Sequence, residues 1–286
     1  MTASLPNKID TLADISGDYD VILCDVWGVL HNGIEPALPA AAALEQARSD
    51  GKVVVLITNA PRLAREVRAS LEAIGVPRAA WDELVTSGDV TRELIAEGAR
   101  RVYHLGPDRD AALFDNLDIE MAEEFEAQTV VCTGLFDDEA ETPQDYEEML
   151  RRLRARDLPF ICANPDIVVE RGDRLVWCAG ALARDYAQMG GRTLIAGKPH
   201  KPIYDAALKA AAKLLEREVP ASKVLAIGDG ILTDIKGAAA NGFDALFVTA
   251  GIHAAEYGGA DPTSAKLAEF LSKHGLWPRA TMPRLR

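Results

Sequence analysis

Five side chains with the chemistry for phosphoryl or metal binding stand where predicted strands end. They are Asp25, Thr58, Lys198, Asp229 and, one helical turn later, Asp234. A carboxylate can attack an electrophile or bind a cation, a hydroxyl can donate a hydrogen bond, and a lysine can neutralise developing charge. Asp229 and Asp234 flank a glycine turn and can converge on one hard cation, for which Mg²⁺ is the usual choice.

Each of these signals has a purely structural explanation. Asp25 can cap the following helix, and Thr58 can do the same for a helix that starts after Pro61. Asp229 and Asp234 can favour a helix N-terminus through the helix dipole, while a single lysine is usually a solvated surface residue. The conjunction is more specific, because the order Asp, Thr, Lys, Asp-x-x-x-x-Asp falls at four separate strand ends.

The elements around these residues alternate between strand and helix, which is typical of a parallel sheet with helices on both faces. Ligands in such open sheets bind outside the carboxyl ends of the strands. The expected strands are short apolar runs, at 21–24, 52–59, 192–197, 223–230 and 244–251. The expected helices lie between them, at 39–48, 62–74, 202–216 and 233–242. Both ends of the chain are therefore predicted to share one doubly wound, Rossmann-like sheet.

The middle of the chain reads as a second α/β unit. It contains an acidic stretch over 107–128, a strand at 128–134, a charged helix from Pro143, and a strand at 158–166. We expect a core domain formed by residues 1–87 and 191–286, with an inserted α/β cap domain over 88–190. Asn164, Asp166 and Gly180 are candidate lid-loop residues of this cap, although N-P-D and A-G sequences also form turns for local reasons.

Four short motifs resemble those of the haloacid dehalogenase superfamily. They are DVWGVL at 25–30, ITN at 57–59, GKP at 197–199 and GDGILTD at 228–234. The insertion between the second and third motifs, with ANPD at 163–166 and WCAGAL at 177–182, is similar to the class IIA, NagD-like branch. The resemblance extends from about Tyr19 to Gly251. It implies Mg²⁺-dependent hydrolysis of a small phosphorylated metabolite, of the sugar phosphate or nucleotide class.

The resemblance also implies a role for individual residues. Asp25 would be the nucleophile that forms an aspartyl-phosphate, and Thr58 and Lys198 would complete the catalytic set. The residues implied to bind substrate are Thr58, Asn59, Lys198 and Asn164. The residues implied to hold Mg²⁺ are Asp25, Trp27 through its carbonyl, Asp229 and Asp234.

Trp27 departs from the family pattern. Phosphatases of this family carry an acid two residues after the nucleophile, and an indole cannot deliver a proton. Loss of a general acid typically costs about 10²–10⁴ in rate. Three hypotheses follow: a phosphatase of low efficiency, a metabolite-binding protein with a sensor or structural role, or dehalogenase-like chemistry, which Asp229 and Asp234 argue against. His31 or His200 is a candidate replacement for the missing acid.

Composition limits the class of partner. A net charge of −13 argues against nucleic acid and anionic membranes as partners. The four cysteines form no C-x-x-C pair and are expected to be buried thiols. We find neither a signal-peptide core nor an apolar run of membrane-spanning length, so we expect a cytoplasmic protein. The resembled branch usually forms cap-to-cap homodimers, so a homodimer is one expectation. The basic tail after Pro278 is expected to be loosely held.

Overall fold

The computed structural model describes residues 5–171 and 174–286, which form two compact units. The first unit contains the chain up to Thr58, Arg68–Val85 and Tyr204–Arg286. The second contains Asn59–Val67 and Thr86–Ile203. These divisions differ from the predicted boundaries at 87/88 and 190/191. The roles of the two units as core and cap stay a prediction.

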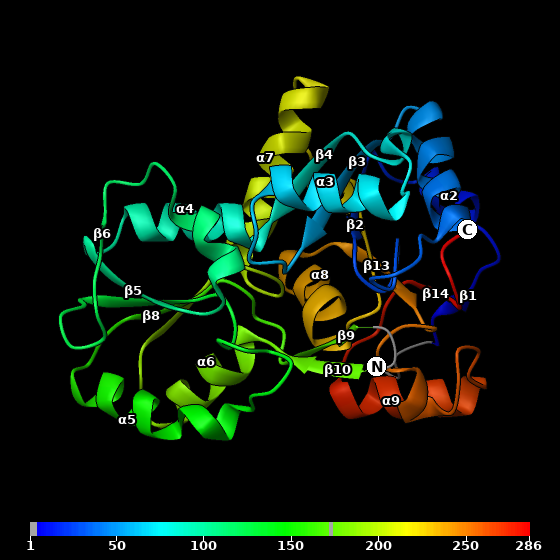
Figure 1. Ribbon diagram of the computed structural model, residues 1–286. Coiled ribbons are helices and arrows are strands. Elements are labelled where there is room, and N and C mark those ends of the chain that lie inside the picture. The colour runs from blue at the N-terminus through cyan, green and yellow to red at the C-terminus, as the bar shows by residue number, and fades with distance from the viewer. Residues whose placement is uncertain (1–4, 172–173) are drawn as a thin grey trace. The chain divides into compact units, whose positions relative to one another are not determined.

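The first unit is built on a seven-stranded sheet in the order β1-β14-β13-β12-β2-β3-β4 (Figure 1). Its strands are β1 (Asn7–Lys8), β2 (Val21–Asp25), β3 (Val53–Thr58), β4 (Glu83–Thr86), β12 (Val224–Gly228), β13 (Asp244–Val248) and β14 (Ala280–Met282). The described pairings from β1 across to β3 are all parallel. β2, β3 and β12 are buried along their whole length, as expected of apolar strands covered on both faces. The predicted α/β fold class is therefore confirmed.

Helices connect these strands. Their bounds are α1 (Ala13–Ser16), α2 (Leu38–Ser49), α3 (Ala64–Ile74), η1 (Arg78–Ala80), α7 (Lys201–Leu215), η4 (Ala221–Lys223), the π-helical turn η5 (Ile231–Ile235), α8 (Lys236–Asn241), η6 (Ala254–Tyr257) and α9 (Ser264–His274). α2 has a proline in its first turn, where the missing N–H is harmless. α8 and α9 end at glycines in the left-handed conformation, Gly242 and Gly275.

The expectation of a loose C-terminal tail is wrong. Residues 280–282 form β14, which pairs with β13 on one side and with β1 on the other. All three residues of the strand are buried, and Leu285 beyond it is 2% exposed. The few apolar residues among the basic ones are too short a pattern to indicate a strand from the sequence.

The second unit is built on a parallel five-stranded sheet in the order β11-β8-β7-β5-β6. Its strands are β5 (Arg101–Leu105), β6 (Glu120–Met121), β7 (Thr129–Cys132), β8 (Phe160–Cys162) and β11 (Thr193–Ile195). β9 (Val168–Arg171) and β10 (Arg174–Trp177) form a separate antiparallel pair. The strand expected at 192–197 does form, but it pairs with β8. Its predicted membership of the sheet that holds the N-terminal strands is therefore wrong.

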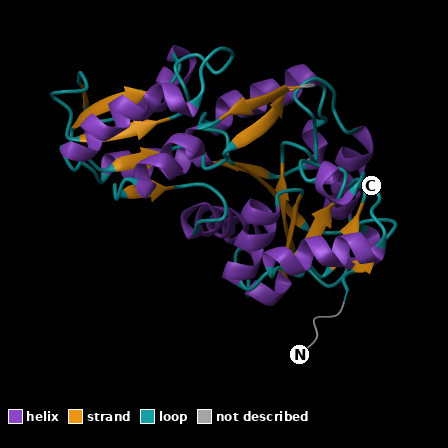
Figure 2. Ribbon diagram, turned by 90° about the horizontal axis from the view of Figure 1, so that it is seen from below, coloured by secondary structure: helices purple, strands orange, loops and turns teal. Residues whose placement is uncertain are grey.

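Alternate residues of this second sheet face two different cores. Val130, Cys132 and Phe160 belong to one hydrophobic cluster, whereas Val131 and Ile161 belong to another. Helices α5 (Glu147–Ala155) and α6 (Ala179–Gln188) pack on the first face, and α4 (Ser87–Ala96) packs on the opposite face (Figure 1). Figure 2 shows the helices and strands of the protein coloured by type. The remaining helical segments are η2 (Asp108–Phe114) and η3 (Pro143–Tyr146). The period-two alternation of strand side chains therefore accounts for the layered arrangement.

All four cysteines are buried free thiols, as predicted. Burial raises the pKa of the Cys162 thiol to about 12, which keeps it protonated and unreactive at neutral pH. Within the described residues, we find no helix of sufficient length and apolarity to cross a membrane.

Candidate functional site

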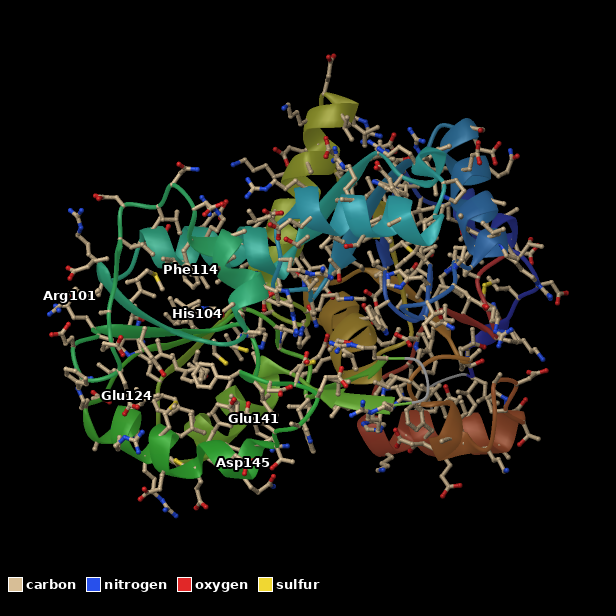
Figure 3. The ribbon with its side chains drawn as sticks, viewed as in Figure 1. Arg101, His104, Phe114, Glu124, Glu141 and Asp145 are labelled. Carbon is tan, nitrogen blue, oxygen red and sulfur yellow. The ribbon has the colours of Figure 1, made fainter. Side chains whose placement is uncertain are left out.

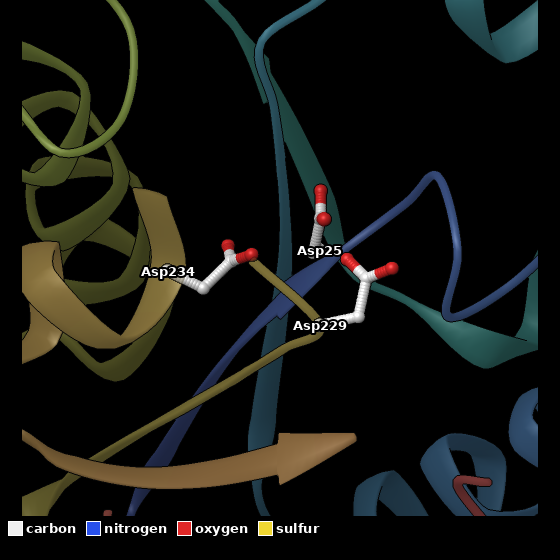
Figure 4. A group of neighbouring side chains, drawn as sticks. All are labelled: Asp25, Asp229 and Asp234. Atoms are coloured by element: carbon white, nitrogen blue, oxygen red, sulfur yellow. The ribbon is translucent and has the colours of Figure 1, made fainter. Parts of the chain in front are cut away.

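Three buried carboxylates from distant parts of the sequence meet in the first unit (Figure 4). Asp25 is the last residue of β2, Asp229 directly follows β12, and Asp234 lies in the π-helical turn η5. Each offers one carboxylate oxygen, and these oxygens all lie within 4.8 Å of one another. The structure thus brings together the three acids that the sequence placed at strand ends.

Strand register explains this convergence. β2 pairs with both β12 and β3, with Cys24 opposite Ile227 and Asp25 opposite Ile57. Asp229 therefore lies two residues beyond the β12 member of its pair, while Thr58 lies one residue beyond Ile57. Thr58 is buried, at 6% exposure, on the strand next to Asp25. The carboxyl ends of three adjacent strands thus present two carboxylates and a hydroxyl.

Backbone N–H groups orient the carboxylates. Asp25 Oδ1 accepts a hydrogen bond from the Val26 N–H at 2.7 Å, and Asp234 Oδ2 accepts one from the Gly230 N–H at 3.0 Å. The Asp234 side chain also lies against Gly228, where a Cβ would come 2.1 Å from its Cγ. The turn that carries Asp229 and Asp234 therefore depends on glycine for close approach.

Asp229 is held between two glycines. A Cβ on Gly28 would lie 2.2 Å from Asp229 Oδ2, and a Cβ on Gly251 would lie 2.0 Å from the same atom. The neighbouring Ile252 N–H donates a hydrogen bond to this oxygen at 3.0 Å. Both glycines therefore leave room for one particular position of the Asp229 carboxylate.

The loop after β13 also holds the turn that carries Asp229 and Asp234 in place. His253 Nε2 accepts a hydrogen bond from the Ile231 N–H at 3.2 Å, and His253 Nδ1 lies 2.6 Å from the Glu256 carboxylate. Because the carboxylate accepts, Nδ1 carries the proton and Nε2 keeps its lone pair for Ile231. None of these supporting residues was predicted from the sequence, since their contacts join segments that are far apart in the chain: they are Gly28, Gly251, Ile252 and His253.

This arrangement fits a hard divalent cation. The three carboxylates are like charges at short range, so a divalent ion bound among them would offset their repulsion. Their donor atoms are all oxygen, which Mg²⁺ prefers. The glycine cradle around Asp229 and the backbone donors to all three acids hold these oxygens in place before an ion arrives. Asp25, Asp229 and Asp234 are thus a chemically suitable set for Mg²⁺.

Two further predicted site residues, Asn59 and Lys198, lie in the second unit. Lys198 is 2% exposed, and Asn59 is 4% exposed. The Asn59 amide bonds to protein atoms: its Oδ1 accepts from the Lys198 N–H at 2.7 Å, and its Nδ2 donates to Asp166 Oδ1 at 2.8 Å. These contacts make Asn59 a structural partner of Lys198.

Asn164 organises a turn. Its Oδ1 accepts a hydrogen bond from the Asp166 N–H at 3.1 Å, and its carbonyl oxygen accepts from the Cys162 thiol. Gly180, in the first turn of α6, packs on this turn so closely that a Cβ would lie 2.1 Å from the Pro165 oxygen. The three candidate lid-loop residues, Asn164, Asp166 and Gly180, therefore lie together at one turn. Their contacts are those of local turn formation, which the N-P-D and A-G sequences also predict.

Trp27 is built into the loop after β2. Its ring meets that of His31 edge to face, with centroids 4.9 Å apart, and it fills the space beside Gly33, where a Cβ would lie 2.8 Å from the indole. His31 is buried, and its Nδ1 accepts a hydrogen bond from the Gly33 N–H at 2.9 Å. This bond requires an unprotonated Nδ1. His200, the other candidate acid, is exposed and lies in the second unit.

A second polar cluster lies in the second unit, near the ends of β5 and β7. His104 Nε2 lies 2.9 Å from Thr133 Oγ1, and Thr133 is hydrogen-bonded to the buried Asp110. The His104 ring meets Phe114 edge to face, with ring centroids 4.8 Å apart. Figure 3 labels both residues. Burial raises the pKa of Asp110 and lowers the pKa of His104. This cluster was not predicted.

Comparisons with known proteins identify the family of the chain. A family model described as haloacid dehalogenase-like hydrolase matches residues 22–120, and an HAD-hydrolase-like model matches residues 195–271. A crystal structure of a haloacid dehalogenase-like hydrolase from Brucella suis 1330 is 55% identical to this chain. It covers 99% of this chain and is itself covered in full, with a TM-score of 0.88.

More distant relatives carry more specific names. A D-glycerol 3-phosphate phosphatase from Mycobacterium tuberculosis is 28% identical over 85% of this chain and 67% of its own length. A glycerol phosphate phosphatase structure from that species, in complex with magnesium, is 26% identical over 84% of this chain and 71% of that one, with a TM-score of 0.64. NagD from E. coli K-12 shares the fold, with a TM-score of 0.66 at 19% identity over 93% of this chain and 96% of that one. The chain therefore belongs to the haloacid dehalogenase-like hydrolase family, with the fold of its class IIA, NagD-like branch.

Proposed function

We propose that this protein is a Mg²⁺-dependent phosphatase that acts on a small phosphorylated metabolite, of the sugar phosphate or nucleotide class, through Asp25. The observation that carries the proposal is the cluster of Asp25, Asp229 and Asp234, with oxygens within 4.8 Å of one another. The relatives named as phosphatases, one of them in complex with magnesium, support it.

In this proposal Asp25 attacks the phosphorus atom and becomes an aspartyl-phosphate, while the bond from phosphorus to the ester oxygen breaks and that oxygen leaves as an anion, which takes a proton from solvent. Water then attacks the aspartyl-phosphate and releases phosphate. Asp229, Asp234, a second oxygen of Asp25 and the Trp27 carbonyl would hold Mg²⁺. The ion, when bound, reduces the repulsion between a carboxylate and a phosphate dianion. The Thr58 hydroxyl donates to a phosphoryl oxygen, and the Lys198 ammonium offsets its charge. Asn164 is proposed to bind the substrate.

Trp27 determines which substrates can react well. No proton can come from the indole, so the departing oxygen must leave without protonation by this residue. His31 is a poor substitute, because its Nδ1 accepts from Gly33 and a neutral imidazole does not readily give up its other proton. We therefore infer that, within the proposed substrate class, the protein prefers the phosphate esters whose leaving groups are most stable as anions.

A leaving-group series tests this proposal. Turnover of aryl and alkyl phosphates with Mg²⁺ should fall steeply as the pKa of the leaving alcohol rises. In Trp27→Asp the dependence should become shallower, with rates for alkyl esters rising by up to about 10²-fold. No turnover of any ester by the wild-type protein would contradict a catalytic role.

The alternative function is a phosphate- or metabolite-binding protein with impaired catalysis, in a sensor or structural role. The packing of Trp27 against Gly33 and His31 favours it, because the loop is built around the residue that replaces the acid. This alternative predicts Mg²⁺-dependent phosphate binding without turnover. We also propose a cytoplasmic location and leave a homodimer as a further hypothesis.

A further inference from the structure

The Asn59 side chain forms a clasp on the backbone of Lys198. Its Oδ1 accepts from the Lys198 N–H at 2.7 Å, and its Nδ2 donates to the Lys198 carbonyl oxygen at 3.3 Å. One amide therefore engages both the donor and the acceptor of a single residue 139 positions away in the sequence. Asn is suited to this task because its amide carries one acceptor and one donor group side by side.

The clasp has a third point of attachment. Asn59 Nδ2 also donates to Asp166 Oδ1 at 2.8 Å, and Asp166 belongs to the turn that Asn164 organises. A hydrogen bond to a charged acceptor is stronger than one between neutral groups. The carboxylate thus fixes the orientation of the amide, so that Oδ1 faces the Lys198 N–H and not the reverse.

Packing leaves the clasp little freedom. A Cβ on Gly197 would lie 2.5 Å from Asn59 Oδ1 and 2.8 Å from the Pro165 ring. Gly197 does not have a positive φ. A side chain at this position is therefore excluded by lack of space and not by the backbone conformation. Asn59, Asp166, Gly197 and Lys198 all lie in the second unit and form one contiguous contact set.

We propose that Asn59 is a positioning residue, which acts by fixing the backbone of Lys198 to the turn at Asp166, and that it does not bind the substrate directly. This inference rests on the proposed role of Lys198 in holding a phosphoryl group. A shift of about 1 Å in a positioned group can cost about 10²-fold in rate. Loss of the clasp should therefore weaken both turnover and phosphate binding.

A double-mutant cycle tests the clasp. Asn59→Asp keeps the acceptor for the Lys198 N–H but places an oxygen against the Asp166 carboxylate. We expect kcat to fall by about 10²-fold. Asp166→Asn alone should lower kcat by less than Asn59→Asp does, since the new amide can still accept from Asn59 although it loses the charge. In the double variant the amide introduced at position 166 can donate to the carboxylate introduced at position 59. We therefore expect at least a tenfold recovery relative to Asn59→Asp.

The matched control is Asn116→Asp, the same chemical change at an exposed position of the second unit. The Mg²⁺ dissociation constant should stay within about twofold in every variant, since the three acidic ligands lie in the first unit. If Asn59→Asp does not fold, Asn59→Ala, which introduces no charge, is expected to show the same fall in kcat. Wild-type kcat in Asn59→Ala, or no recovery in a folded double variant, would overturn the inference.

Binding of inorganic phosphate with Mg²⁺, measured by calorimetry, separates this inference from the proposed function. If the wild-type protein binds phosphate without turning over esters, the proposed catalysis fails. The clasp still predicts weaker phosphate binding in Asn59→Asp and recovery in the double variant. Equal phosphate affinity in all three proteins would overturn the clasp whether or not the enzyme is active.

Discussion

Each unit of the molecule buries carboxylates near the carboxyl ends of its strands, but the two groups are built differently. In the first unit three carboxylates point their oxygens at one small volume. In the second unit the buried Asp110 carboxylate is hydrogen-bonded to Thr133, and the Thr133 hydroxyl oxygen lies 2.9 Å from His104 Nε2. Convergent like charges are costly without a cation, whereas a chain of donor and acceptor is satisfied by the protein itself.

The direction of the hydrogen bonds shows what the chain of Asp110, Thr133 and His104 can do. An ionised Asp110 only accepts, so Thr133 gives it its single hydroxyl proton, and His104 donates from Nε2 to the Thr133 oxygen. A threonine that donates to a carboxylate is not activated as a nucleophile. We interpret this chain as structural: it joins η2 to β5 and β7.

The largest expected difference between the clusters is in catalysis. Asp25→Asn should lower kcat by roughly 10⁴-fold or more, on the scale of other nucleophile removals. Asp110→Asn, the same chemical change in the second unit, should leave kcat within about twofold. Steady-state rates with an aryl phosphate measure both. Comparable losses of kcat in the two variants would contradict the proposal that the first cluster is catalytic and the second structural.

The glycine cradle should control metal affinity. Gly251→Ala would place a Cβ 2.0 Å from Asp229 Oδ2, so the carboxylate must move. We expect Mg²⁺ affinity to fall by about 10–100-fold, the range found when the support of a metal ligand is disturbed. Gly17→Ala is the control, because its Cβ would meet nothing within 4 Å. Calorimetric titration with Mg²⁺ measures both, and unchanged affinity in Gly251→Ala would argue against the cradle.

Metal binding should also stabilise the fold. A ligand at one hundred times its Kd contributes about 2.7 kcal/mol to the free energy of unfolding. Thermal unfolding of the wild-type protein should therefore shift upward with Mg²⁺, and the shift should be lost in Asp229→Asn but kept in Asp110→Asn. An equal shift in all three proteins would point to a cation site elsewhere.

The smallest effects concern pH. Burial lowers the pKa of His104 below its ordinary value, so the stability associated with neutral His104 is present above about pH 6.5 and is lost as pH falls through the folded-state pKa. In His104→Gln this loss should disappear, because the amide does not titrate. Urea unfolding between pH 7 and pH 5 measures the change. An unaltered pH dependence would exclude His104 as its source.

Asp110 should show the opposite sign. Its pKa is raised by burial, so the ionised form carries a cost that appears as pH rises from about 3.9, the unfolded value, through the folded-state pKa. Asp110→Asn should therefore gain stability relative to wild type as pH rises across this window. Urea unfolding curves at intervals of pH would reveal it, and a difference between the proteins that does not vary with pH would contradict it.

The strands that carry the three site acids and Thr58, namely β2, β3 and β12, were predictable because their signal is local. The apolar runs before Asp25, Thr58 and Asp229 and the glycine turns after them are contained in a few residues each. From these the fold class and the family followed. The gathering of the three acids also followed, because the carboxyl ends of parallel strands lie at one edge.

Features set by long-range pairing were beyond the sequence. β11 reads the same whichever sheet it joins, and its pairing with β8 depends on the path of the whole chain. The tail strand β14 is recognisable only beside β13. Asn59 looks like a helix cap or a ligand for substrate, and its contact with Lys198 joins two segments with no common pattern.

The most direct test of the central claim is a crystal grown with Mn²⁺ in place of Mg²⁺, with anomalous scattering used to locate the ion. We predict one strong peak per chain, within coordination distance of carboxylate oxygens of Asp25 and Asp229. A peak at another site, or an empty carboxylate cluster at saturating Mn²⁺, would contradict the account.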